Sequence, residues 1–154
     1  MTDRVRGPGS GLVRLRLSRH AGQGLLDGAW WPRDDDLHGE LGLLLTVLPT
    51  EALPLSRVTY SPADWRPVLP ANLTVDGFPV TVGRFARRDT HLVVLRSLGR
   101  RTYTLLVVPP LFSAEQGAEA LRAALTFRNA YAARGLLRAV TEQFPDGGGH
   151  RWTT

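Results

Sequence analysis

The chain contains no cysteine, no lysine and no isoleucine. Without cysteine there is no thiolate nucleophile, disulfide, iron–sulfur cluster or sulfur-ligated zinc. Without lysine there is no Walker-type phosphate loop, Schiff-base lysine or kinase strand lysine, because each of these needs an ammonium group at a defined position. The absences exclude the corresponding classes of thiol, nucleotide and pyridoxal enzyme.

Metal-binding spacings and long apolar runs are also missing. The four histidines, His20, His38, His91 and His150, lie far apart and show neither the i, i+4 nor the H-x-H spacing that places two imidazoles on one metal. No apolar run approaches the roughly 18 residues of a membrane span, and the polar N-terminal stretch lacks the roughly 7–15-residue apolar segment of a secretory signal. We therefore expect a cytoplasmic protein with no metal and no cofactor.

The positive charge of the chain comes entirely from arginine, which supplies all 19 basic residues for a formal net charge of +5. Since lysine and isoleucine have AT-rich codons, a GC-rich coding sequence would produce this usage without any selection for phosphate binding. The distribution is more informative. Residues 1–77 carry 8 arginines and 9 acids, whereas residues 78–154 carry 11 arginines and 5 acids, so the basic excess is C-terminal.

Two strands and a helix are predicted in the first third of the chain. Residues 12–19 alternate apolar and arginine side chains with period two, as in a half-buried strand, and residues 27–31 form a short second strand before Pro32. Asp34–Asp36 then begins a helix with leucines on one face, and Pro49 ends it. These acids are better explained as an N-terminal cap than as a cation site, because helical neighbours point about 100° apart.

The rest of the chain is read as strands joined by short turns, followed by helix. Strands are predicted at residues 57–61, 73–75, 80–84, 91–97 and 102–108, with hairpin turns at Asp76-Gly77 and at 98–101. Pro79 argues that its strand lies at a sheet edge. Ser113 and Gln116 form a capping box for a helix with an apolar stripe at Ala118, Leu121 and Leu125, and a second helical pattern runs over 127–144.

This order of elements predicts a single α+β domain over residues 12–144. We expect one antiparallel sheet of about six to seven strands, with one inserted helix and one or two C-terminal helices, and a partly open barrel is the alternative. Residues 1–11 are expected to be a disordered lead-in and residues 145–154 a flexible tail.

Four segments resemble an uncharacterised actinobacterial family, a domain of unknown function. They are DGAWWPR at 27–33, RVTY at 57–60 with Trp65, VTVGRF at 80–85 and LLVVPP at 105–110. The resemblance covers about residues 12–125 and implies a GC-rich genome, but it carries over no catalytic residue. The helical stretch 127–144 lies outside it.

The paired tryptophans suggest a binding surface. Since adjacent strand residues face opposite sides, one of Trp30 and Trp31 is expected in the core, while the other either packs or stacks on a base, a sugar or a partner. More aromatic and charged residues follow the strand that starts at residue 57. The candidate ligand-binding residues are Trp31, Arg33, Arg57, Tyr60, Asp64 and Trp65.

The arginines suggest a second surface, because guanidinium groups match phosphate geometry. Solvated charge on strand exteriors and hairpin ends is the simpler explanation of the same residues. The candidates for a nucleic-acid or phosphate interface are Arg84, Arg87, Arg88, Arg100, Arg101, Arg134 and Arg138, together with Arg96.

The leading hypothesis is a small binding or regulatory module that recognises a protein or an anionic small molecule through an aromatic and arginine surface. The alternative is a nucleic-acid-binding protein that uses the arginine-rich C-terminal half. A second alternative is a metal-free enzyme that uses Asp27 or Asp64 with His91, provided that these groups face one pocket. Asp27 is otherwise explained as a turn residue before Gly28.

Overall fold

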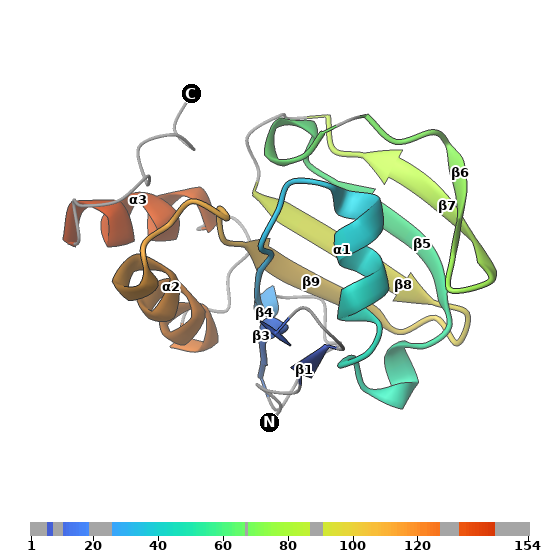
Figure 1. The fold of residues 1–154 in the computed structure, drawn as a ribbon, viewed down its shortest axis with the longest axis horizontal. Helices are drawn as coiled ribbons and strands as arrows, with labels where there is room; N and C mark the ends of the chain where they lie inside the picture. The colour runs from blue at the N-terminus through green and yellow to red at the C-terminus, as the bar shows by residue number, and fades with distance from the viewer. Residues whose placement is uncertain are drawn as a thin grey trace.

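The computed structural model describes residues 6–7, 11–18, 26–66, 68–86, 91–126 and 133–143. A seven-stranded sheet has the order β3-β4-β9-β8-β5-β7-β6, and α1 lies across one of its faces (Figure 1). Its strands are β3 (Arg14–Leu17), β4 (Leu26–Trp31), β5 (Leu55–Tyr60), β6 (Asn72–Val75), β7 (Phe78–Arg84), β8 (Leu92–Ser97) and β9 (Thr102–Val107). The helices are α1 (Leu37–Leu44), α2 (Ala114–Thr126) and α3 (Ala133–Gln143), with 3-10 turns η1 (Thr50–Ala52) and η2 (Pro62–Asp64).

The α+β class is confirmed, but the expected antiparallel sheet is wrong: the sheet is mixed. β4 pairs in parallel with β9, and β5 pairs in parallel with β7. Both parallel pairs join strands that are not consecutive in the sequence, whereas the turn signals report only the antiparallel hairpins between neighbours. The sheet ends at β3 and β6 and is not a closed barrel.

Both predicted hairpins are confirmed. Asp76 and Gly77 have φ values of 54° and 83°, the positive pair that a type I′ turn requires, and the β8–β9 turn contains Arg100 at φ 70°. The edge position predicted from Pro79 is wrong, because β7 lies between β5 and β6. Pro79 is tolerated because the pairing with β5 begins only at Thr81, so its missing N–H removes no bond to that strand.

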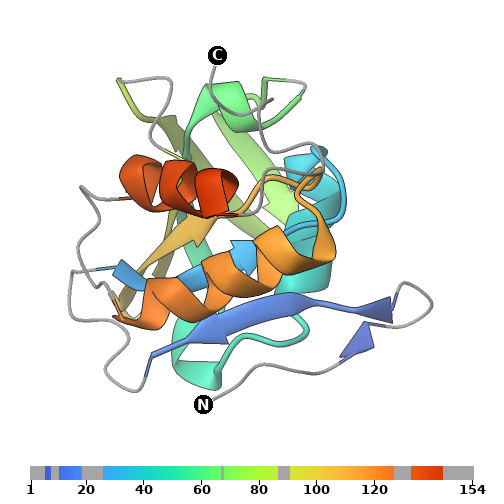
Figure 2. The same ribbon diagram turned by 90° about the vertical axis from the view of Figure 1, so that its left-hand side faces the viewer.

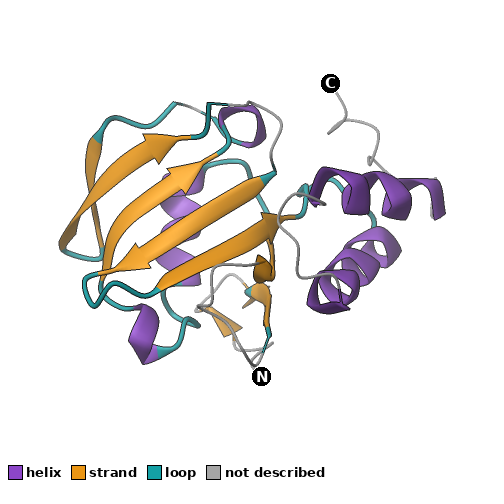
Figure 3. Ribbon diagram, turned by 180° about the vertical axis from the view of Figure 1, so that it is seen from behind, coloured by secondary structure: helices purple, strands orange, loops and turns teal. Residues whose placement is uncertain are grey.

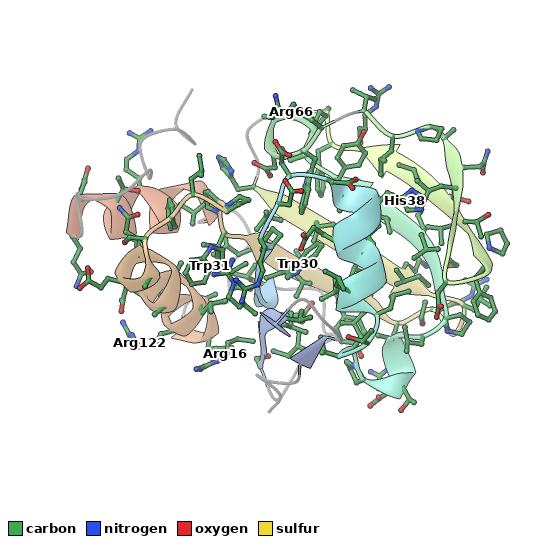
Figure 4. The ribbon with its side chains drawn as sticks, viewed as in Figure 1. Arg16, Trp30, Trp31, His38, Arg66 and Arg122 are labelled. Carbon is green, nitrogen blue, oxygen red and sulfur yellow. The ribbon has the colours of Figure 1, made fainter. Side chains whose placement is uncertain are left out.

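Two hydrophobic cores lie on opposite faces of the sheet. The first packs α1 against β3, β5, β8 and β9 and contains Trp30, while the second packs α2 and α3 against β4 and contains Trp31. Figure 4 shows the two indoles on opposite sides of β4. Consecutive strand residues alternate between faces, so one dipeptide supplies an aromatic anchor to each core.

The first helix follows the prediction at its start and ends earlier than expected. Asp36 is the N-cap, and its carboxylate accepts a hydrogen bond from the Gly39 amide at 3.4 Å. The helix ends at Leu44 instead of continuing to Pro49, and turn residues fill the interval.

The second helix is capped as predicted but faces the sheet differently. The Ser113 hydroxyl accepts from the Gln116 amide, and the Gln116 side chain accepts from the Ser113 amide, which confirms the capping box. The expected apolar stripe is only partly confirmed: Leu121 packs half-buried against the second core and Leu125 is half-buried, but Ala118 is exposed. The buried face instead consists of Gln116, Gly117, Ala120, Ala123 and Ala124.

Small side chains on α2 allow close contact with β4. A Cβ atom at Gly117 would overlap the Trp31 indole, so the ring occupies the space that a side chain would need. Figure 2 shows α2 and α3 next to each other on the side of β3 and β4. The contact with Trp31, and not leucine content, decides which face of α2 is buried.

The structure describes only short parts of the N-terminal and C-terminal regions of the chain. A two-stranded sheet pairs β1 (Arg6–Gly7) with β2 (Gly11–Leu12), so it begins in the stretch 1–11 that is expected to be disordered and ends at the first residue of the predicted domain. The tail predicted at 145–154 lies outside the described residues, as do residues 127–132 of the second helical pattern. Within the described ranges, none of the helices has the length and apolar character to cross a membrane.

Candidate functional site

The aromatic candidates are buried, which corrects the expectation of an exposed aromatic surface. Trp31 is 7% exposed, Trp65 is 4% exposed and Tyr60 is fully buried. Trp65 packs on Trp30 with ring centroids 5.4 Å apart, and the Tyr60 hydroxyl accepts a hydrogen bond from the Leu69 amide at 3.1 Å. Large aromatic rings contribute most to the stability of a fold when they are removed from water, as all three are here.

Arg57 is separated from the residues with which it is grouped in the sequence. Tyr60 belongs to the core on the α1 face of β5, whereas Arg57 lies on the opposite face and is exposed. The spacing of three along a strand already places these two side chains on opposite sides. Strand alternation alone therefore separates Arg57 from Tyr60 among the candidate ligand-binding residues.

Arg14 holds the backbone that leads into the candidate site. Its guanidinium lies over the Trp31 ring, with Cζ 3.7 Å from the centroid, and it donates to the carbonyl oxygens of Trp31 and Pro32 at 3.1 Å each. Burial, reinforced by the positive charge of Arg33, lowers the pKa of Arg14 to about 10. Arg14 therefore stays charged at neutral pH and fixes the chain just before Arg33.

Glu40 of α1 continues this support. Its carboxylate accepts a hydrogen bond from the Arg33 amide at 3.3 Å, and the side chain is 9% exposed. Burial raises the pKa of Glu40 above its ordinary value of 4.5, and the bond from Arg33 opposes that rise. A cavity of about 10 Å³ beside Arg14, Arg33 and Glu40 has room for about one water molecule.

A cleft of about 370 Å³ opens beyond Arg33, where three segments of the chain meet. One segment lies between β4 and α1, the second covers η2 and the residues after it, and the third begins at the last residue of β9 and continues beyond it. The lining residues are Arg33, Asp34, Asp35, Ala63, Asp64, Arg66, Val107, Pro109, Pro110 and Leu111. Of the candidate ligand-binding residues, the structure brings only Arg33 and Asp64 together here.

Hydrogen bonds join the three segments around the cleft. Arg66 donates from its amide to the Asp35 carbonyl at 2.9 Å and from Nε to the Asp35 carboxylate at 3.0 Å. The Val108 amide donates to the Trp30 carbonyl at 2.9 Å, which attaches the third segment to β4. The walls are therefore tied to one another through the backbone.

The charged rim of the cleft surrounds an apolar wall. Asp34 and Asp35 provide two carboxylates at the rim, and Asp64 provides a third that is only 9% exposed, against the two guanidinium groups of Arg33 and Arg66. Arg66 is paired with Asp35, although its side chain is 80% exposed, so this ion pair is screened by water. On the other wall Leu111 is 55% exposed after two prolines, a large apolar group presented to solvent.

Asp64 pairs with His91 behind the cleft. Nδ1 of His91 lies 2.9 Å from Oδ1 of Asp64, and the two side chains are 3% and 9% exposed. His91 has a left-handed backbone with φ 54°, which is uncommon for a residue other than glycine. Asp64 borders the cleft, but His91 is not among the lining residues. His91 is therefore placed to hold the Asp64 side chain in position from behind.

Asp27 does not join this pair, which corrects the first form of the enzyme hypothesis. Its side chain is fully buried and accepts a hydrogen bond from the Thr104 amide at 2.7 Å, at a bulge between β4 and β9. His91 meets β9 through the Val107 amide, three residues or about 10 Å farther along the strand. Asp27 stabilises the irregular start of a parallel strand pair.

The arginines proposed for a phosphate interface are spread over the molecule. Arg84 lies at the end of β7 beside Tyr60, whereas Arg100 and Arg101 lie in the β8–β9 turn, at the end of the sheet where β5 begins. Arg138 is exposed on α3. Arg87, Arg88 and the side chain of Arg134 lie outside the described residues.

Sequence reasoning missed most of the cleft. The sequence pattern assigns Asp34 and Asp35 to helix capping, and Arg66 stands in no recognisable motif. The sequence signal for the cleft is Leu111 directly after Pro109-Pro110, since a large apolar residue in a predicted turn has no core to join. Within the described residues there is no cluster of three acidic or histidine side chains that could hold a metal ion.

A family model described as a family of unknown function, DUF5994, matches residues 14–124. This confirms the predicted resemblance to a domain of unknown function over about residues 12–125, while the actinobacterial source stays a prediction. Comparisons with curated proteins and with solved structures give no match. The matched range contains every residue that lines the cleft and ends within α2.

Proposed function

Because the chain belongs to the DUF5994 family of unknown function, we propose its function from the site alone: it is a small binding or regulatory module that recognises a segment of a partner protein at the cleft. The observation that carries this proposal is the convergence of three chain segments on one cavity of about 370 Å³, which is in the size range of small-ligand and peptide-side-chain sites.

The lining of the cleft supports a protein segment over an anionic small molecule. Three carboxylates outnumber two guanidinium groups, so the local charge favours a partner with a basic group. Pro109, Pro110 and Leu111 offer an apolar wall next to those charges. The matching partner is a peptide segment that carries an arginine or lysine beside an apolar side chain.

The supports behind the cleft favour recognition by a preformed surface. Arg14, Glu40 and His91 are buried or half-buried. Glu40 and His91 fix Arg33 and Asp64 at the cleft, and Arg14 fixes the backbone just before Arg33. A preformed site loses less conformational entropy when it binds. We accordingly assign Trp30, Trp31 and Trp65 to the framework that holds the cleft in shape.

Selection from a displayed peptide library, followed by affinity measurements on variants, tests this function. Leu111→Asp should weaken binding of the selected peptides by about tenfold, which corresponds to about 1.4 kcal/mol. The matched control is Leu98→Asp in the β8–β9 turn, because Leu98 is 63% exposed and lies away from the cleft.

A second pair of variants tests the charge of the partner. Asp34→Asn should weaken the same peptides, and the loss should shrink as salt rises, since exposed charges are screened within about 10 Å at 0.1 M. Asp76→Asn in the β6–β7 turn removes an equal charge elsewhere and should leave affinity unchanged. Peptides that bind Leu111→Asp and Asp34→Asn as tightly as the natural chain would refute the assignment of the cleft.

A further inference from the structure

In the part of the chain that the structure describes, one half of the sheet has a face that no helix covers. α1 lies on one side of β5, β8 and β9. On the other side α2 and α3 pack against β3 and β4 and against Leu92 of β8 and Leu106 of β9, at the ends of those two strands. Figure 3, seen from behind, shows the strands β5, β7 and β8 with no described helix in front of them. This open face is separate from the cleft and shares no lining residue with it.

The strand registers align polar side chains in one row across the open face. Asn72 pairs with Thr81, Thr81 pairs with Arg57, Arg57 pairs with Arg96, and Arg96 pairs with Thr102. Directly paired residues project to the same side of a sheet. At about 4.8 Å between strands, the row over five strands extends about 19 Å.

Two arginines stand next to each other at the centre of this row. Like charges directly opposite each other across a strand pair are destabilising. The side chain of Arg57 extends over Gly83, where an added Cβ would lie 2.5 Å from its Nη2 atom. Glycine at position 83 therefore leaves the space that the Arg57 guanidinium occupies, next to the hydroxyl of Thr59.

No carboxylate balances these arginines within the strands that form the face. The described strands β5, β6, β7, β8 and β9 contain no aspartate or glutamate. Both Arg57 and Arg96 are exposed. Two adjacent guanidinium groups with threonine hydroxyls on either side form a donor set that suits phosphate oxygens.

We propose that this open face, centred on Arg57 and Arg96, binds the phosphate backbone of single-stranded nucleic acid. The row extends across five strands, which suits a ligand with several phosphates in succession more than one small anion. The aromatic residues Tyr60 and Tyr103 of the same strands point into the opposite core, so bases have no stacking platform here. Binding through phosphates alone is independent of sequence.

The test is fluorescence polarisation of a labelled oligothymidylate of roughly 12 nucleotides, a length within the range of sheet-face sites. The natural chain should bind with an affinity that falls linearly with the logarithm of salt between about 50 and 200 mM. Arg57→Gln and Arg96→Gln should each lower that slope by about 0.7 and weaken binding about fivefold. Arg138→Gln on α3 removes the same charge outside the face and should change neither value.

Folding does not confound this test. Replacing either arginine removes a like-charge repulsion, so the melting temperature of each variant should stay equal or rise. Equal losses from Arg138→Gln would show general charge attraction and overturn the site. A failure of the natural chain to bind the oligonucleotide, or a preference for vesicles of acidic phospholipid with the same arginine dependence, would overturn the proposed occupant.

Discussion

At the scale of the residue, the tryptophan pair shows how one dipeptide organises both cores. Trp30 meets Trp65 on the α1 side, and Trp31 lies between the guanidinium of Arg14 and the backbone of Gly117 on the other side. Burying rings of this size is the largest single apolar contribution that a side chain can make. The tryptophan pair therefore has a structural role, and the charged residues that follow it, Arg33, Asp34 and Asp35, line the cleft.

A residue-scale prediction concerns the buried carboxylate of Glu40. Because its folded-state pKa lies above its ordinary value, the folded chain holds this proton more tightly than the unfolded chain does. The free energy of unfolding should therefore fall as pH rises from the unfolded pKa through the folded pKa. Glu40→Gln should remove this fall while it keeps an acceptor for the Arg33 amide. Urea unfolding at a series of pH values above 4.5 measures the effect.

The control for that series is Glu142→Gln on the exposed surface of α3. This variant removes the same formal charge but should reproduce the pH dependence of the natural chain. If Glu40→Gln also shows an unchanged pH dependence, the burial of Glu40 does not affect its protonation, and its role as a support of Arg33 loses its electrostatic basis.

At the scale of the element, the packing of α2 on β4 depends on the small size of the residues on the buried face of α2. The buried face of α2 consists largely of alanine and glycine, so its backbone approaches the Trp31 ring directly. A helix with leucines at these positions would have to stand farther from the sheet. Because Leu121 and Leu125 are only half-buried, an argument from the positions of the leucines places the buried face of α2 away from its centre.

Paired glycine substitutions test this contact. Gly117→Ala should destabilise the fold by about 1–3 kcal/mol, because the new methyl group overlaps the Trp31 indole. Gly135→Ala on α3 meets nothing within 4 Å and should stabilise by about 0.5–1 kcal/mol through helix propensity. Chemical denaturation gives both values, and near-ultraviolet circular dichroism reports the Trp31 environment. A stabilising Gly117→Ala would show that α2 does not lie on the ring.

At the scale of the whole molecule, one sheet separates two cores, and the candidate sites lie in regions of the sheet that the helices do not cover. The cleft forms where the segments that leave β4 and β9 meet η2, and the open face remains where α2 and α3 do not reach. Helix α1 occupies the opposite side of that open region. The arrangement gives the molecule two surfaces of different charge: the acidic cleft and the arginine row.

The two cores should respond independently to mutation. Val58→Ala in the α1 core and Val140→Ala in the α2–α3 core should each lower the free energy of unfolding by about 1–3 kcal/mol. Because the sites share no packing partner, the double variant should equal the sum within about 0.5 kcal/mol. A coupling energy well above that value, measured by urea unfolding, would mean that the sheet transmits strain between the cores.

The sequence by itself determined the local elements and the excluded chemistries. Alternation in β3, the Asp-Gly turn between β6 and β7, the Asp36 cap and the Ser113 capping box are short-range signals, because each depends on residues within a few positions of one another. The absence of lysine and cysteine needs no structure to interpret. Short segments such as residues 27–33 also indicated the family.

Only the tertiary structure decided how distant segments combine. It placed β4 in parallel beside β9, buried Trp31 under α2, paired Asp64 with His91, and aligned Arg57 with Arg96. None of these pairs has a local signature, because the partner of a strand or a side chain far along the chain is selected by the total burial and hydrogen bonding of the folded molecule. The candidate sites depend on such long-range pairs, and so they emerged from the fold.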